Sequence, residues 1–276
     1  MTIAERTDLA RRLDELCDPL PFHIGWHLND LATGATADRN GDDVVPSAST
    51  RKIAILMTAL SLVRKGTLAL DMPVAIPPEH HQNDSGVLQH LTPGITLPLR
   101  DVLMLMIIVS DNACTATVVD LVTLERVNEL CAGIGMRGTT HRDAMGGAGN
   151  VTTPNDVGLL LDTILRGTRD GGAADRLGAT PELCALALDI LSRQKLRTRL
   201  PSLLPEGTRI AHKTGTGKGV FNDAGIVFRN DRPLFILTAY TSGVPYELPD
   251  GTPGFAAAAR LIGSLALTCF DRLSQP

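Results

Sequence analysis

The sequence predicts an α+β fold, in which an antiparallel β-sheet is flanked by N- and C-terminal helices and an all-helical lobe is inserted between the strands. Strand-like segments cluster near the two ends of the chain, at about residues 22–39 and 208–242. Most of the chain between them has the apolar spacing of helices, and a helix is expected near each end. Strands and helices that occur in separate blocks favour an α+β architecture over an alternating one.

We expect residues 1–276 to form one domain with two lobes. An α/β lobe would comprise about residues 1–48 and 196–276, and a helical lobe would comprise about residues 49–195. The 276 residues are 43% hydrophobic, which is ample for a large buried core.

The N-terminal part of the α/β lobe begins with an amphipathic helix and continues into a hairpin. Apolar residues fall on one helical face before residue 17, at Ile3, Leu9, Leu13 and Leu16. Polar and apolar residues then alternate over residues 22–29, as in a strand with one buried face. Residues 32–36, with sequence ATGAT, are expected to form the turn into a second strand.

The helical lobe is predicted from segments whose apolar residues recur every three or four positions. The first of them, residues 50–64, has Ile53, Leu56, Met57, Leu60 and Val63 on one face. Further helices are expected within residues 97–110, 118–135, 154–165 and 182–194. Pro154 suits the first turn of its helix, and Gly133 and Gly135 are stop signals.

The C-terminal part returns to strands and ends in a helix. Residues 208–217, 223–228 and 233–242 are short segments rich in β-branched or apolar residues and separated by turn residues. Residues 252–273 are rich in alanine and predict a terminal helix. We expect strands from both ends of the chain to pair in one sheet.

Composition excludes several classes of partner. The net charge is −4 and aromatic residues are only 3%, so no nucleic acid is expected as a partner. The seven histidines have no metal-ligand spacing, and we expect neither a metal nor a cofactor. Five cysteines without a CxxC pair are interpreted as free thiols in a reducing compartment. No apolar stretch of about 20 residues was recognised, so no membrane partner is expected.

The strongest chemical signal is Ser49 followed three residues later by Lys52, at the start of the helix predicted for residues 50–64. This spacing puts the two side chains on one face, about one turn apart. A serine hydroxyl needs a nearby base to become a nucleophile, and a lysine can serve if burial or nearby cations lower its pKa. Amides at a helix N-terminus would stabilise a developing negative charge at Ser49.

The pattern alone is weak, because Ser192 and Lys195 have the same spacing. Two further triplets strengthen it. Ser110-Asp111-Asn112 follows a predicted buried helix, and Lys213-Thr214-Gly215 lies in a predicted strand. The three motifs, in this order and on these elements, match a described catalytic set.

With these motifs the sequence resembles the class A β-lactamases and their penicillin-binding relatives. The resemblance extends through PSASTRKIAIL, SGVLQHLTPG, NVTTPNDVGLLL, ILSRQKLRTRLPSLLPEGTRIAHKTGTG and NDAGIV. It implies a serine hydrolase with a small-molecule substrate, a β-lactam or a related amide or ester.

The resemblance also implies a role for each motif residue. Ser49 would form the acyl-enzyme, Lys52 would take its proton, and Ser110 would pass a proton to the leaving nitrogen. Lys213 would hold Ser110 and a substrate carboxylate. The oxyanion hole would be the backbone amides of Ser49 and Thr216. The expected substrate-binding residues are Asn112, Thr214, Gly215, Thr216 and Asn222.

Two departures from the family concern the chemistry of the site. Class A enzymes use a loop glutamate to activate the deacylating water, but residues 138–153 contain no glutamate here. Asp143 is the acid in that loop, and it is either a deacylation base or a solvated partner of Arg142 or Arg137. On the strand after Lys213, Asn222 occupies the position where many class A enzymes have a carboxylate-binding arginine.

A third departure concerns location. The first 21 residues contain eight charges and no uninterrupted apolar stretch, so no export signal is recognised and a cytoplasmic protein is expected. The three departures leave open a cytoplasmic esterase, amidase or acyltransferase, a D-amino-acid peptidase, or a sensor that is acylated and not released.

Overall fold

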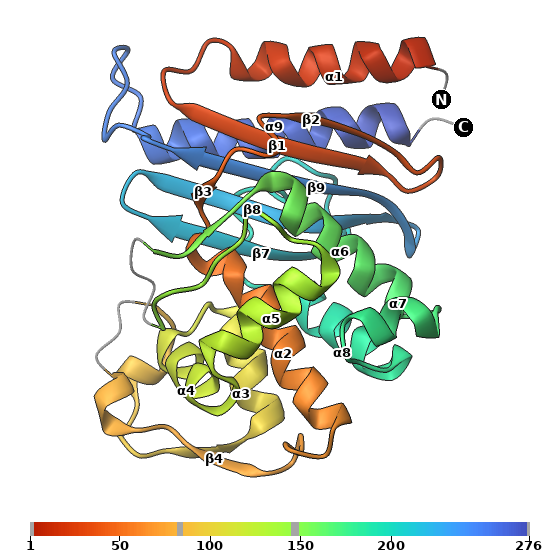
Figure 1. Ribbon diagram of the computed structural model, residues 1–276. Coiled ribbons are helices and arrows are strands. Elements are labelled where there is room, and N and C mark those ends of the chain that lie inside the picture. Colours follow the sequence, from red (N-terminus) through yellow and green to blue (C-terminus); the bar gives the residue numbers. More distant parts are fainter. Residues whose placement is uncertain (1–2, 82–84, 145–148, 275–276) are drawn as a thin grey trace.

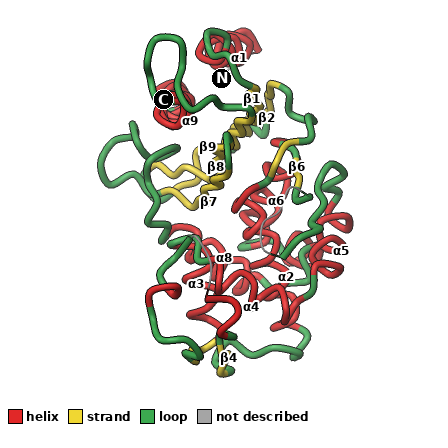
Figure 2. Tube along the Cα trace, turned by 90° about the vertical axis from the view of Figure 1, so that its left-hand side faces the viewer, coloured by secondary structure: helices red, strands yellow, loops and turns green. Residues whose placement is uncertain are grey.

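The computed structural model describes residues 3–81, 85–144 and 149–274. Its elements form layers around one central sheet (Figures 1 and 2). Helices α1 (Ile3–Cys17) and α9 (Gly254–Leu273) lie on one face, and the helical lobe lies on the other. The α+β prediction with terminal helices and an inserted helical lobe is confirmed.

The sheet has five antiparallel strands in the order β2-β1-β9-β8-β7. The strands are β1 (His23–Asp30), β2 (Ala35–Arg39), β7 (Ile210–Gly217), β8 (Val220–Arg229) and β9 (Arg232–Ser242). The first strand pairs with the last along its whole length, from His23 opposite Ser242 to Asp30 opposite Phe235. Strands from both ends of the chain therefore share one sheet, as the sequence predicts.

The lobe contains helices, as expected, together with two short β-ribbons that the sequence did not predict. Its α-helices are α2 (Lys52–Arg64), α3 (Leu99–Ile108), α4 (Asn112–Val122), α5 (Leu124–Ile134), α6 (Pro154–Gly167), α7 (Gly171–Arg176) and α8 (Pro181–Ser192). Short 3₁₀ turns are η1 (Ala48–Arg51), η2 (Pro78–His81) and η3 (Leu88–His90). The ribbons pair β3 (Val45–Pro46) with β6 (Val151–Thr152), and β4 (Pro73–Ala75) with β5 (Thr96–Pro98).

The helix expected within residues 118–135 is two helices. Thr123 separates α4 from α5 with a φ of 65°, a backbone conformation that β-branched residues rarely adopt. Its hydroxyl accepts a hydrogen bond from the amide of Arg126 and so caps α5.

Two apolar cores lie on the two faces of the sheet. Leu9, Leu13 and Leu265 of the terminal helices pack with Trp26 of β1 in one core. The other core joins the helical lobe to the opposite sheet face, and α6 packs directly on β1 and β9. The core between lobe and sheet positions the residues described below. The residue ranges that we expect for the two lobes remain a prediction.

Within the described part of the chain, α9 has the length and apolar composition of a membrane span. The sequence reading did not recognise it as such a stretch. In the fold α9 packs on the sheet, and Leu261, Ile262, Leu265 and Ala266 are buried in the core there. A core helix with this packing meets the same length and composition criteria.

Candidate active site

Ser49 lies in the η1 turn, directly before α2, and is half-buried. Ala48, the residue before it, has a φ of 43°, which is rare for a residue with a Cβ. The turn is held by hydrogen bonds from the Thr50 hydroxyl to the Ser47 carbonyl (2.6 Å) and from Tyr240 on β9 to Thr50 Oγ1 (2.9 Å). The nucleophile candidate is therefore fixed by both lobe and sheet.

Lys52 is buried, with 1% of its surface exposed, and its ammonium group faces the segment at residues 110–112. Its Nζ donates to Asn112 Oδ1 (2.8 Å), to the Ser110 carbonyl (2.7 Å) and to Ser110 Oγ (3.2 Å). Burial, followed by the nearby cations Lys213 and Arg51, lowers the pKa of Lys52 well below its usual value. A lysine with a lowered pKa can accept a proton, as the sequence analysis required of Lys52.

Ser110 and Asn112 are presented by a tightly held loop. Ser110 has a φ of 58° and is buried, and Asn112 begins α4. Asp111 between them accepts hydrogen bonds from the amides of Val87 (2.7 Å), Leu88 (2.9 Å) and Cys114 (2.9 Å). The carboxylate of Asp111 thus anchors the segment that carries Ser110.

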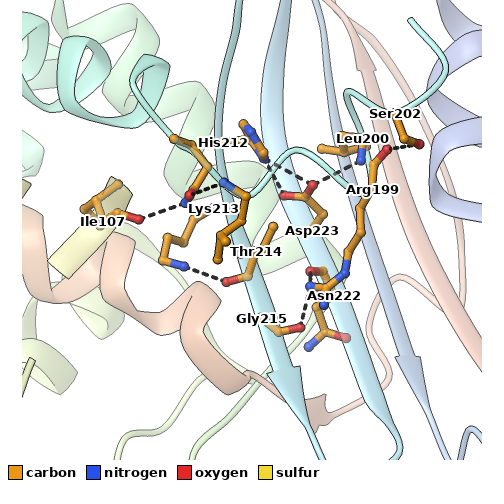
Figure 3. Close-up of polar contacts among 12 residues, drawn as sticks. Ile107, Arg199, Leu200, Ser202, His212, Lys213, Thr214, Gly215, Asn222 and Asp223 are labelled. Carbon is orange, nitrogen blue, oxygen red and sulfur yellow. Dashed lines mark hydrogen bonds and ion pairs between the residues drawn. The ribbon is translucent and has the colours of Figure 1, made fainter. Parts of the chain in front are cut away.

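Lys213 on β7 is completely buried, and its Nζ donates to the Thr214 carbonyl at 2.8 Å (Figure 3). Burial lowers the pKa of Lys213 to about 7, although the nearby Asp223 raises it. Among the described contacts, Lys213 makes no hydrogen bond to Ser110, so the expected interaction between the two residues is not present. Lys213 does lie close enough to Lys52 to lower the pKa of that lysine.

Gly215 allows β7 to approach the turn that carries Ser49. A Cβ at this position would lie 3.1 Å from Ala48 Cβ and 3.1 Å from the Ser47 carbonyl oxygen. Both contacts would be tight, so glycine suits the close packing of β7 on this turn. Thr214 is buried and Thr216, on the same edge strand, is exposed.

Arg199 is a residue that the sequence reasoning missed. Its buried guanidinium donates to the carbonyls of Gly215 (2.8 Å) and Asn222 (2.6 Å) (Figure 3). It also donates to Thr216 Oγ1 (2.5 Å). Burial lowers the pKa of Arg199. The segment before β7 therefore supplies an arginine beside Thr216. Its signal in the sequence was its place in the matching stretch ILSRQKLRTRLPSLL.

Asn222 is buried within the fold, whereas a substrate contact would require an accessible side chain. Asn222 is fully buried, its Nδ2 donates to the Pro46 carbonyl (2.9 Å), and its Oδ1 accepts from the amide of Thr241 (3.1 Å). Both ends of the amide are therefore used to join β8 to β3 and β9. We correct the expectation and leave Asn222 out of the proposed substrate site.

His212 is paired with a buried carboxylate on the neighbouring strand. Its Nδ1 lies 2.9 Å from Asp223 Oδ1, and both side chains are fully buried. Asp223 also accepts a hydrogen bond from the amide of Leu200 (3.1 Å). Figure 3 shows the His212 and Lys213 side chains on different sides of β7, which follows from the alternation of a strand.

Asp143 is half-buried in the loop before β6. Its carbonyl accepts hydrogen bonds from Arg51 Nη1 (2.6 Å) and Asn150 Nδ2 (2.9 Å). Burial lowers the pKa of Arg51 to about 10, and the nearby Asp143 carboxylate opposes this shift. The Asn150 carbonyl in turn accepts from the amide of Ser47 (3.0 Å). The loop that carries Asp143 is thereby attached to the turn of Ser49. A role of Asp143 in deacylation stays a prediction.

The second Ser-x-x-Lys pair lies in a different environment. The Ser192 hydroxyl donates to the Leu188 carbonyl in the last turn of α8 (2.8 Å), and Lys195 follows that helix. Within residues 3–81, 85–144 and 149–274, no group of three His, Cys, Asp or Glu side chains could hold a metal ion.

Comparisons with known proteins agree with this arrangement. The model of the beta-lactamase enzyme family matches residues 8–273. A beta-lactamase from Sphaerobacter thermophilus is 28% identical, with a TM-score of 0.84 and 96% of each chain covered. PBP-A is 25% identical, with a TM-score of 0.84, and 97% of this chain and 96% of PBP-A are covered. A PBP-A variant solved as an acyl-enzyme complex with penicillin G is 27% identical, with a TM-score of 0.83 and 97% of each chain covered.

No curated protein matches the chain. The family match nevertheless extends from α1 to the last turn of α9 and includes every element that carries a residue of the site. The chain therefore belongs to the beta-lactamase enzyme family.

Proposed function

We propose that the protein is a serine hydrolase of the class A type, which forms an acyl-enzyme at Ser49 from a β-lactam or a related amide or ester. Family membership supports a hydrolase of amide bonds. The observation that carries the finer proposal is Lys52, a fully buried lysine with a lowered pKa that bonds to both Ser110 and Asn112.

In this proposal Lys52 accepts the proton of Ser49 as the hydroxyl attacks the substrate carbonyl. The backbone amides of Ser49 and Thr216 stabilise the oxyanion. Ser110, which is hydrogen-bonded to Lys52, then delivers a proton to the leaving nitrogen. Lys213 and Arg199 attract a substrate carboxylate toward Thr214 and Thr216, with Asn112 beside the acyl side chain.

A second candidate function is favoured by the loop before β6. Residues 138–153 contain no glutamate, and the loop is fastened to the Ser49 turn through Asn150. A site that acylates well and has a weak base for water releases the acyl group slowly. A protein with slow release of the acyl group to water would be an acyltransferase or an acylated sensor. The esterase and D-amino-acid peptidase alternatives require faster hydrolysis of the acyl-enzyme. The cytoplasmic location expected from the sequence fits this second candidate function.

The test is to mix the pure protein with a chromogenic cephalosporin or a short-chain nitrophenyl ester. Absorbance follows turnover, and intact mass follows acylation. The first function predicts steady turnover of the β-lactam. The second predicts a covalent adduct that persists long after mixing. An esterase would turn over only the ester.

Ser192→Ala is the matched control for Ser49→Ala, because both serines precede a lysine by three residues. We expect Ser49→Ala to abolish the adduct and Ser192→Ala to leave it unchanged. Full activity of Ser49→Ala on every substrate would disprove the acyl-enzyme proposal. Asp143→Asn tests the deacylation base: a longer-lived adduct supports Asp143 in that role, and an unchanged lifetime assigns the role elsewhere.

A further inference from the structure

A cavity lies at the end of the sheet opposite the catalytic residues. It has a volume of about 540 Å³ and is lined by the C-terminal half of α6, the turn between α6 and α7, and the ends of β1, β8 and β9. Phe228 of β8 and Pro233 of β9 line it, whereas Lys213 and Gly215 pair with Ala224 and Asn222 toward the other end of β8. Its volume is typical of small-molecule sites.

The wall of this cavity is partly apolar. Leu31, Leu165, Leu188, Phe228 and Pro233 contribute to the lining from strand ends and helices. Such a surface favours a ligand with an apolar body, because burying that body removes apolar area from water.

Asn29 is a buried polar group in the same lining. It is 6% exposed, and its Nδ2 donates to Asp162 Oδ1 at 3.4 Å. Its Oδ1 has no hydrogen-bond partner in the described part of the chain. Buried polar atoms are nearly always paired, so this oxygen is suited to accept a hydrogen bond from a bound hydroxyl or amine.

The charges at the cavity are unequally neutralised. Asp162 is paired with Arg166 at 2.9 Å. The Asp170 carboxylate accepts a hydrogen bond from the amide of Gly172 (2.9 Å), which satisfies one oxygen and leaves its negative charge in place. Arg169 has no ion pair within the described residues.

Arg209 is only weakly neutralised. Its guanidinium lies 4.3 Å from the centre of the Phe228 ring, and its nearest carboxylate, that of the 88% exposed Asp231, is 3.9 Å away. An exposed pair of this kind contributes little. Arg169 and Arg209 are therefore the least neutralised cations of the lining and the ones available to bind an anion.

We infer that this cavity, lined by Asn29, Phe228, Arg169 and Arg209, is a binding site for a small organic carboxylate with an apolar body and a hydroxyl or amine donor. The carboxylate binds Arg169 and Arg209, the body lies on Phe228 and its apolar neighbours, and the donor reaches Asn29 Oδ1. This site is separate from the proposed acylation site at Ser49.

The experiment is an NMR titration of the isotopically labelled full chain with 4-hydroxybenzoate, and with 6-hydroxyhexanoate as a flexible alternative. Benzoate lacks the hydroxyl donor, and 4-hydroxybenzamide lacks the charge. Amide shifts of Leu31, Arg166 and Asp231 report on this cavity, whereas those of Lys213 and Thr216 report on the Ser49 site.

We expect saturable shifts at the cavity amides with a hydroxy-carboxylate, and binding of the uncharged amide weaker by about tenfold or more. The double variant Arg169→Gln/Arg209→Gln should weaken carboxylate binding to a similar extent, and Arg126→Gln, an exposed change on α5, should not. Asn29→Ala should weaken binding of 4-hydroxybenzoate but not of benzoate. The spectrum of each variant shows directly whether it is folded.

Three outcomes would each overturn the inference. The first is the absence of shifts at the cavity amides up to about 20 mM of either hydroxy-carboxylate, a concentration that saturates a millimolar site. The second is equal binding of the acid and its amide. The third is unchanged binding by a folded double arginine variant. Shifts confined to Lys213 and Thr216 belong to the first outcome, because the carboxylate then binds only beside Ser49.

Discussion

Lys52 and Lys213 are two fully buried lysines whose surroundings give them different chemical uses. Lys52 donates hydrogen bonds to Ser110 and Asn112 and has a pKa lowered by burial and by Lys213. Lys213 has a pKa of about 7, because burial outweighs the attraction of Asp223. One lysine is suited to accept a proton, and the other can hold a charge near neutral pH.

Replacing Lys52 with alanine should slow acylation by at least about 100-fold, because a positioned general base contributes about that much. The measurement is the rate at which a β-lactam adduct appears by intact mass after rapid mixing. Lys65→Ala, at the exposed end of the same helix, is the control and should acylate at the normal rate. An unchanged rate in Lys52→Ala would assign proton removal to another group.

The pKa of Lys213 predicts a pH dependence that differs between substrates. Below about pH 7 Lys213 is protonated and attracts a carboxylate, and above that pH it loses its charge. The kcat/KM for a β-lactam with a free carboxylate should therefore fall above about pH 7, by at most about tenfold per pH unit for one group. A neutral nitrophenyl ester should not show this fall.

The two pH profiles should be measured on the same preparation, from about pH 5 to about pH 10. The decline must be specific to the anionic substrate. Parallel profiles for the acid and the ester would show that Lys213 does not select the carboxylate.

Among the larger elements, the segment at residues 85–88 and the start of α4 act as one unit around Asp111. Gly86 has a φ of 101°, and a Cβ there would lie 2.1 Å from Asp111 Oδ2, so glycine is required. The Ser85 hydroxyl donates to the Ser110 carbonyl at 3.0 Å. This unit fixes the positions of Ser110 and Asn112 relative to Lys52.

Asp111→Ala should lower the free energy of unfolding by at least about 2 kcal/mol, because the backbone amides of Val87, Leu88 and Cys114 lose a charged acceptor. Urea unfolding measures the change. Asp120→Ala is the control on the same helix: its carboxylate is 59% exposed and pairs with His80, and its loss should cost less than about 1 kcal/mol. Equal effects of the two substitutions would contradict the anchoring role of Asp111.

The sequence predicted the elements that are long and regular, and it did not predict contacts between distant segments. The periodicity of residues 50–64 and the Pro154 signal correspond to α2 and α6. The β3–β6 and β4–β5 ribbons have only two or three residues per strand, too few to produce an alternating pattern.

The same limit applies to the candidate site. The motif positions Ser49, Lys52, Ser110 and Lys213 could be selected from spacing together with the family resemblance. The contacts of Arg199 and the burial of Asn222 depend on how the segment before β7 and the Pro46 carbonyl lie against β8. Neither relation is local in the sequence, so periodicity and motif spacing did not indicate it.

The molecule as a whole is organised around two cores with the sheet between them, and each core holds cysteines. Cys114, Cys131 and Cys184 lie in the core of the lobe, and Cys17 of α1 and Cys269 of α9 lie in the core between the terminal helices and the sheet. All five thiols are free and buried. Burial raises the pKa of the thiols, to about 12 for Cys17 and Cys131 and to about 11 for Cys184.

The native protein should therefore react with almost none of its five thiols when treated with a disulfide reagent near pH 8. Thiolates are the reactive form, and burial both blocks access and disfavours ionisation. Unfolding in denaturant should expose all five together. One or more fast-reacting thiols in the native state would show that a core opens locally.

The pairing of β1 with β9 has a consequence for how the chain folds during synthesis. His23 of β1 pairs with Ser242 of β9, more than two hundred positions later, so the centre of the sheet forms only after β9 has been synthesised. Contacts of such sequence separation slow folding. On the ribosome the nascent lobe would emerge with its sheet-facing apolar surface uncovered until the last strands arrive. The surroundings of Lys213 on β7 therefore form late, after β8 and β9 have been synthesised.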